Sequence, residues 1–209
     1  MKVPALTLSL LAAAGLATPV RRDVGQEVYT LRLSSPAKFL DGLYLTTNPN
    51  SDKANTTTLV VYTSPSKPNV PAVRFYPVLD PSTKLAELRT PSSPSSNTAL
   101  AVVGTNGLFD FARIADPDGT ADELPEGTTV DWTSFRLDEG ESAGTVKYDG
   151  GSGDEEAEGN WVVFPLRGSS VETKEKEEEL WGVKWKGGNA WTTMDYLPVE
   201  VVYELVTHK

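Results

Sequence analysis

The chain has 209 residues, and its 29 acidic residues outnumber its 19 lysines and arginines, which gives a net charge of −10 at neutral pH. This acidity argues against nucleic acid and anionic membranes as partners, because both attract basic patches. The chain contains no cysteine and one histidine, His208, beside its last residue. Disulfides are therefore excluded, and His/Cys zinc sites and His-dependent nucleophilic catalysis are disfavoured. We expect a protein without a cofactor.

The first residues are typical of a secretory signal peptide. Lys2 precedes an uncharged apolar stretch that ends in Gly15-Leu16-Ala17, and small residues of this kind precede signal-peptidase cleavage. The stretch is shorter than the roughly 20 residues of a membrane-spanning helix. We expect residues 1–17 to be a signal peptide. Residues 18–22 end in Arg21-Arg22, which resembles the dibasic processing sites of fungal secretory precursors. The expected product is a secreted monomer of one domain, 23–209, outside the cell or in the cell wall.

Short apolar runs separated by Gly, Pro, Asn, Asp and Ser predict strands along the whole expected domain. Twelve runs begin near Val28, Leu43, Leu59, Val73, Leu85, Ala99, Leu108, Trp132, Thr145, Trp161, Leu180 and Val199. Taken in groups of four, the first members lie 57 and 60 residues apart, and the second members lie 56 and 62 apart. Spacing of this kind indicates an internal repeat. We expect an all-β domain and favour a β-trefoil-like barrel, with a two-sheet sandwich or jelly roll as the alternative.

Two local patterns support strands in particular places. Asn106-Gly107 separates two apolar runs and predicts a hairpin turn, because both residues tolerate positive φ. Trp181, Val183 and Trp185 alternate with Gly182 and Lys184, so we expect the two tryptophans on a buried face. The runs from Trp132 and Trp161 are likewise expected to contribute core tryptophans.

Three further segments contain candidate sites. Asn55-Thr56-Thr57 is an N-glycosylation sequon in a polar stretch. Asp116, Asp118 and Asp122 form a partial calcium-loop pattern, although acidic turn formers give the same pattern without a metal. The segment from Gly187 places Trp191 in a turn near Asn189 and Asp195. An aromatic face beside amide and carboxylate groups is suited to binding a sugar, so these three residues are the candidate carbohydrate site.

Four stretches resemble a group of small secreted fungal proteins with no assigned activity: 39–45, 99–110, 131–135 and 198–204. They consist of strand and turn sequence. The resemblance therefore implies a secreted all-β fold and supplies no catalytic residues. The chain lacks the repeated Gln-x-Trp element of ricin-type lectins, which are sugar-binding trefoils.

Three functions remain open. The first is a secreted, non-catalytic binding module for carbohydrate or cell-wall polymer. The second is a protein-binding module, such as a protease inhibitor or a host-directed secreted factor. The third is a glycoside hydrolase that uses a pair of carboxylates, for which Asp110 and Asp195 are candidates because each lies among aromatic residues. We expect binding rather than catalysis, with an extracellular glycan or protein as the partner.

Overall fold

The computed structural model describes residues 27–51, 55–63, 69–91, 97–117, 119, 124–138, 143–150, 159–166 and 180–207. The expected signal peptide and the Arg21-Arg22 site lie outside these residues. Strand residues make up 57% of the described chain, which confirms the all-β prediction. None of the helices in the described part is both long enough and apolar enough to cross a membrane.

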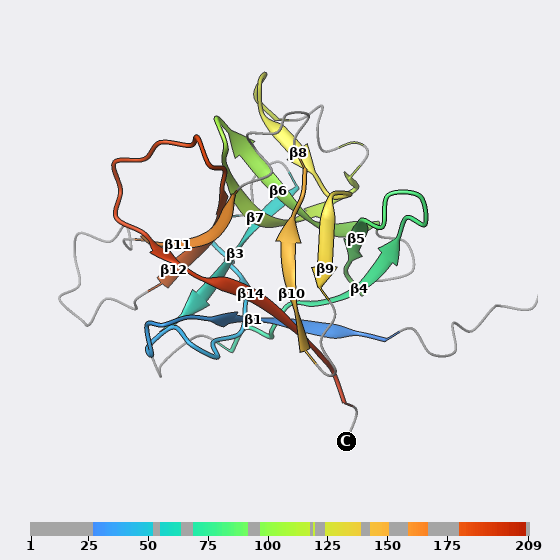
Figure 1. Ribbon diagram of the computed structural model, residues 1–209, viewed down its shortest axis with the longest axis horizontal. Helices are drawn as coiled ribbons and strands as arrows, with labels where there is room; N and C mark the ends of the chain where they lie inside the picture. The colour runs from blue at the N-terminus through green and yellow to red at the C-terminus, as the bar shows by residue number, and fades with distance from the viewer. Residues whose placement is uncertain are drawn as a thin grey trace, which may run out of the picture.

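Fourteen strands are present in the described part of the chain (Figure 1). They are β1 Tyr29–Ser34, β2 Thr46–Thr47, β3 Thr56–Tyr62, β4 Arg74–Leu79, β5 Ala86–Arg89, β6 Thr98–Thr105, β7 Leu108–Ala115, β8 Thr129–Asp131, β9 Phe135–Asp138, β10 Ala143–Tyr148, β11 Asn160–Leu166, β12 Leu180–Lys186, β13 Leu197–Pro198 and β14 Glu200–Leu205. Each of the twelve predicted runs overlaps or adjoins a strand. The run from Trp132 differs in detail, because its residues 132–134 lie between β8 and β9.

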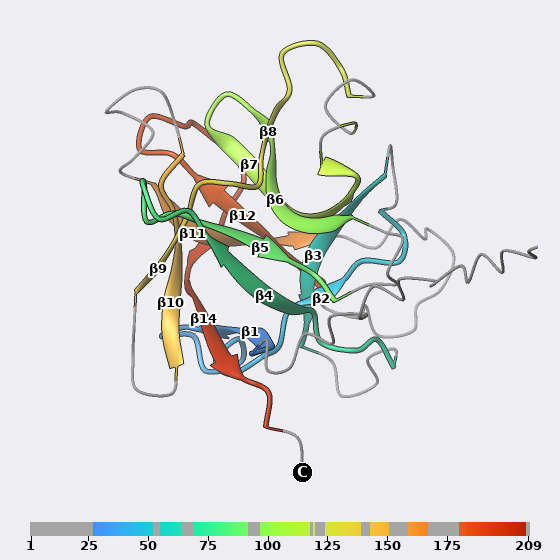
Figure 2. The same cartoon turned by 90° about the vertical axis from the view of Figure 1, so that its right-hand side faces the viewer.

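Six strands pair in a closed antiparallel ring, which is the barrel core of the fold. The ring runs β1–β4–β5–β9–β10–β14 and returns to β1. The longest pairing in it joins β1 to β14, which lie side by side in Figures 1 and 2. The shortest joins β5 to β9 through the single residue pair Ala86 and Phe135. Closure matters because an open sheet leaves unpaired edges that invite association with other chains.

Six of the eight strands outside the ring form three hairpin pairs, β2–β3, β6–β7 and β11–β12. The other two are short: β8 pairs with β6, and β13 pairs with β11. The second strands of these hairpins also pair with one another, β3 with β7 and both with β12. The arrangement follows the grouping predicted from the spacing. The first and fourth members of each group form the ring, and the second and third form a hairpin.

The main core contains buried residues of both the ring and the three hairpins, and it is rich in aromatic side chains. Trp161 and Trp185 are each 3% exposed, and their ring centroids lie 5.1 Å apart. The ring of Phe111 packs 4.7 Å from that of Trp161. Trp161 Nε1 donates a hydrogen bond to the carbonyl of Val146 at 2.6 Å, which satisfies its one polar atom. Burial of these large rings supplies the stability that a chain without cysteine cannot take from disulfides.

A second, smaller apolar cluster lies apart from the barrel core, on β6 and β7. Ala99, Ala101, Val103, Ala112 and Ile114 form it. Leu124, Val130 and Trp132 pack against it, so Trp132 belongs to this smaller cluster. Strands β6 and β7 are consequently buried on both faces, which fits their nearly continuous apolar sequence.

Candidate functional site

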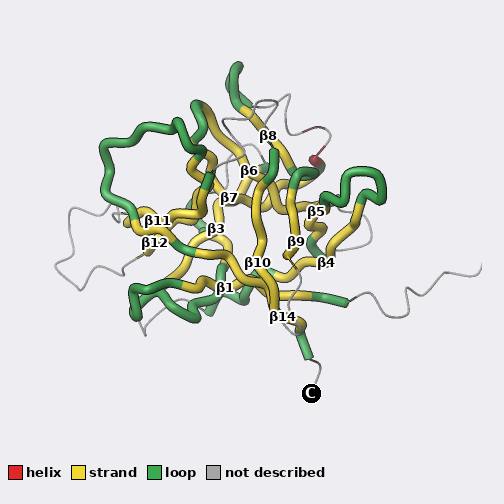
Figure 3. Tube along the Cα trace, in the orientation of Figure 1, coloured by secondary structure: helices red, strands yellow, loops and turns green. Residues whose placement is uncertain are grey.

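The connection from β12 to β13 contains all three residues of the predicted carbohydrate site, Asn189, Trp191 and Asp195. We call residues 187–196 the Trp191 loop; it bows outward on the left of Figures 1 and 3. The side chain of Trp191 is 86% exposed, and Met194 and Tyr196 in the same loop are also exposed. A tryptophan that gains so little from burial contributes little to the stability of the fold. Its flat apolar face is therefore available to a ligand.

The base of the loop is held by the turn between β6 and β7. The amide of Gly187 donates to the carbonyl of Gly107 at 2.7 Å, and the amide of Ala190 donates to the carbonyl of Gly187 at 3.0 Å. Asn106 and Gly107 have φ values of 55° and 72°, as expected for the predicted two-residue hairpin turn. A Cβ at Gly107 would lie 3.2 Å from the Cβ of Ala190, so the glycine allows turn and loop to meet closely.

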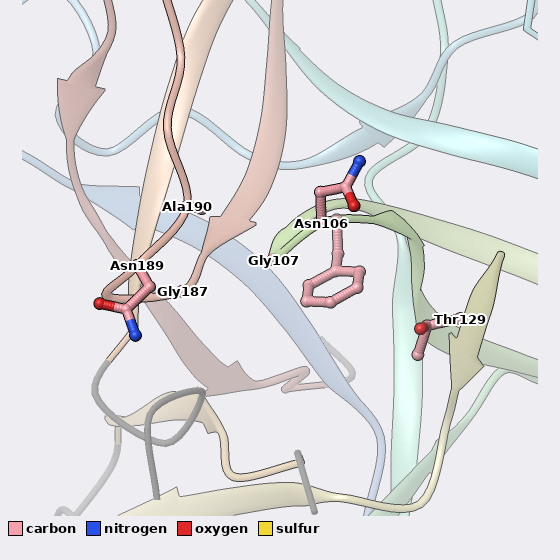
Figure 4. Close-up of a pocket in the computed structure, with 7 residues that line it drawn as sticks. Asn106, Gly107, Thr129, Gly187, Asn189 and Ala190 are labelled. Atoms are coloured by element: carbon pink, nitrogen blue, oxygen red, sulfur yellow. The ribbon is translucent and has the colours of Figure 1, made fainter. Parts of the chain in front are cut away.

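A hollow of about 330 Å³ lies between this turn, the loop base and the start of β8 (Figure 4). We call it the first hollow. In Figure 4, Gly187 and Asn189 lie on one side, Thr129 on the other, and Asn106 and Gly107 between them. Its lining is uncharged and consists of Asn106, Gly107, Phe109, Thr129, Gly187, Asn189 and Ala190.

Phe109, the aromatic residue of the lining, packs against a tyrosine whose hydroxyl is held by hydrogen bonds. The ring of Phe109 meets that of Tyr148 edge to face, at 6.2 Å. The Tyr148 hydroxyl donates to Asp131 Oδ2 at 3.0 Å, and Asp131 Oδ1 accepts from the amide of Thr133 at 2.8 Å. Strand β8 thus contributes Thr129 to the hollow and Asp131 to the support beneath it.

The predicted site residues divide between these features. Asn189 lines the first hollow, Trp191 stands beside it on the same loop, and Asp195 lies exposed further along that loop. Sequence reasoning missed Phe109 and Thr129, and it recognised Asn106-Gly107 only as a turn. The turn was visible as a motif, but its contact with the Trp191 loop has no local signature.

The remaining candidates have different surroundings. Lys184 Nζ lies 2.5 Å from Asp110 Oδ1, which places Asp110 in an ion pair between β7 and β12. Asp116 is exposed with φ of 50°, while Asp118 and Asp122 lie outside the described residues. Among the residues that the structure describes, no three His, Cys, Asp or Glu side chains gather as metal ligands. Asn55 is exposed in the turn that begins β3, with φ of 59°.

Comparisons with protein-family models, with curated proteins and with solved structures found no match to this chain.

Proposed function

We propose that the protein is a secreted, non-catalytic module that binds carbohydrate, with Trp191 as its stacking platform. The observation that carries the proposal is the 86% exposure of Trp191 beside a polar, uncharged hollow. Met194 and Tyr196 of the same anchored loop are exposed as well, and a group of exposed apolar side chains on a protein surface favours a role in binding. Sugars combine apolar ring faces with hydroxyl groups and fit such a surface.

The polar lining supplies the second half of sugar recognition. The amides of Asn106 and Asn189 and the hydroxyl of Thr129 can each donate and accept hydrogen bonds. Sugar hydroxyls need both kinds of partner. The two segments that form the hollow are fixed to each other by the bond from Gly187 to Gly107, so less ordering is needed when a ligand binds.

We assign the barrel to the β-trefoil class as part of this proposal. The closed six-stranded ring and the three mutually paired hairpins support it, because a trefoil repeats one four-strand unit three times. The resemblance to small secreted fungal proteins and the signal-like first residues support secretion to the cell exterior or wall. We propose that the protein is a monomer and that its partner is an extracellular glycan.

The test replaces Trp191 with alanine and measures binding to insoluble glucan, chitin and mannan by pull-down. Stacking of an exposed ring contributes on the order of 1 kcal/mol, so Trp191→Ala should weaken binding several-fold to about tenfold. The melting temperature should hardly change. Phe39→Ala is the matched control, because Phe39 is also an exposed ring but packs against Trp181 and does not line the first hollow.

Unchanged binding by Trp191→Ala would contradict the proposal, as would unfolding of the variant. Exposed Met194 and Tyr196 beside Trp191 also suit a protein partner. A protease-inhibition panel with the same variants tests this alternative. If the protein is a protein-binding module, the wild type should inhibit a protease and bind no polysaccharide, and Trp191→Ala should lose the inhibition.

A further inference from the structure

A second hollow of about 330 Å³ lies where the Trp191 loop returns to the barrel. Its lining includes Ser34 and Ser35 at the end of β1, Asn160 at the start of β11, and Pro198 and Glu200 after the loop. Hydroxyl, amide and carboxylate groups therefore converge there, and these are the groups that bond sugar hydroxyls. The Trp191 loop thus begins at one polar hollow and ends at another.

The strand register places the two hollows close together. Asn160 is directly opposite Lys186 in the antiparallel pair of β11 and β12, and Gly187 of the first hollow follows Lys186. Opposite residues in such a pair have Cα atoms about 5 Å apart, and consecutive Cα atoms are about 3.8 Å apart. The Cα atoms of Asn160 and Gly187 therefore lie within about 9 Å of each other.

The surface between the two hollows belongs to the face of strands β11 and β12 that the Trp191 loop covers. Opposite residues of an antiparallel pair direct their side chains to the same face, so Asn160 and Lys186 share one. Lys186 Nζ lies 5.9 Å from the centre of the Tyr196 ring, which brings the loop over that face. Tyr196 is exposed, so the loop presents a second aromatic ring in addition to Trp191.

The charge of the site limits the class of glycan. The first hollow has an uncharged lining, and Glu200 is the charged residue of the second. The whole chain has a net charge of −10, which repels polyanions such as pectic acids at a distance. The first hollow offers a cationic polymer no acidic group, and Lys186 on the face between the hollows repels it at short range.

We infer that the ligand is an extended, uncharged polysaccharide chain that occupies both hollows at once and crosses the Trp191 loop between them. The inference rests on the proposed carbohydrate binding and specifies its substrate class. Several consecutive sugar units then share the contacts, so affinity grows with chain length until both hollows are filled. Short fragments occupy one hollow and lose the contacts of the other.

The experiment measures the affinity of disaccharides and hexasaccharides of the gluco-, chito- and manno- series by calorimetry, at low and high salt. For the series that binds, the hexasaccharide should bind at least about tenfold more tightly than the disaccharide, with little dependence on salt. Asn160→Ala and Glu200→Ala should each weaken hexasaccharide binding about threefold to tenfold, through lost hydrogen bonds. Asn69→Ala is the control, because Asn69 is exposed and outside both hollows.

Equal affinity for the short and long oligosaccharides, with Trp191→Ala weakening both, would overturn the extended site and leave sugar binding intact. Hexasaccharide affinity unchanged in both Asn160→Ala and Glu200→Ala would also overturn it. Binding confined to chitosan or polygalacturonate would overturn the uncharged class. Failure of the wild-type protein to bind any glycan would overturn the proposed function together with the inference.

Discussion

The tryptophans of this chain have different surroundings, and these set what each can contribute. Trp161 and Trp185 are enclosed by other aromatic rings in the barrel core. Trp181 is half-buried near the start of β12 and packs against the exposed ring of Phe39, with centroids 5.6 Å apart. Trp191 is exposed. The alternation around residue 183 predicted both tryptophans on a buried face; this is confirmed for Trp185, whereas Trp181 is only partly buried.

This difference predicts unequal costs of truncation. Trp161→Ala should lower the free energy of unfolding by about 3–5 kcal/mol, because it leaves a large cavity and removes the hydrogen bond to the Val146 carbonyl. Trp181→Ala should cost clearly less, because part of its ring already contacts water. Urea denaturation of both variants gives the comparison. Equal costs would mean that Trp181 is as fully enclosed as Trp161.

The hairpin turn at Asn106-Gly107 was the local element that the sequence predicted best. Asn-Gly between two apolar runs specifies a turn through local backbone preference, and the turn at 106–107 confirms it. Strand β8 was not predicted because it has three residues, and its partner β6 lies far away in the sequence. The same limit applies to the first hollow. Its residues come from a turn, a short strand and a loop that only the folded pairing brings together.

The contact between the turn and the Trp191 loop predicts a distinctive effect of Gly107→Ala. Positive φ would strain alanine by about 1 kcal/mol, and the new Cβ would press on Ala190 at 3.2 Å. Both stability and glycan affinity should therefore fall. Gly42→Ala is a matched control, because Gly42 has φ of 76° with open space around its Cβ position.

Gly42→Ala should lower the melting temperature while leaving glycan binding unchanged. Melting curves and binding isotherms of the two variants separate strain from displacement of the loop. Equal binding by both variants would show that the position of the loop does not matter for the ligand.

At the scale of the whole molecule, the fold was more predictable than the site. The threefold spacing of apolar runs is a property of the entire chain, and it predicted an all-β fold with a barrel, although it did not say which strands would form the ring. Barrel closure depends on register, which alternation specifies only where one face is buried. The polar hollows lie at junctions between segments, where exposed Asn, Ser and Thr have no periodic pattern. Trp191 was the exception, because an aromatic residue in a glycine-rich turn is unusual in itself.

The barrel wall also has a charged network that makes stability depend on pH. Asp138 on β9 lies 2.6 Å from Lys147 Nζ on β10 and near Arg136, and the same carboxylate accepts from the Thr145 hydroxyl. The bond from Lys147 lowers the pKa of Asp138 below its ordinary value, with smaller contributions from the two cations and Thr145. A carboxyl with a lowered folded-state pKa stabilises the fold above its unfolded pKa, about 3.9, and loses that effect as the pH falls further.

Asp138→Asn should therefore destabilise the protein at neutral pH and lose its effect in acid. The pair is partly exposed, so solvent screening limits the cost to a few tenths of a kcal/mol and at most about 1 kcal/mol. Urea denaturation of the wild type and the variant across a pH series should give curves that separate above about pH 4 and converge below it, as the carboxyl protonates in both states. Added salt should shrink the gap at neutral pH, because exposed ion pairs are screened. If the difference in stability between wild type and variant persists unchanged in acid, the destabilisation by Asp138→Asn comes from packing or from the lost hydrogen bond of Thr145.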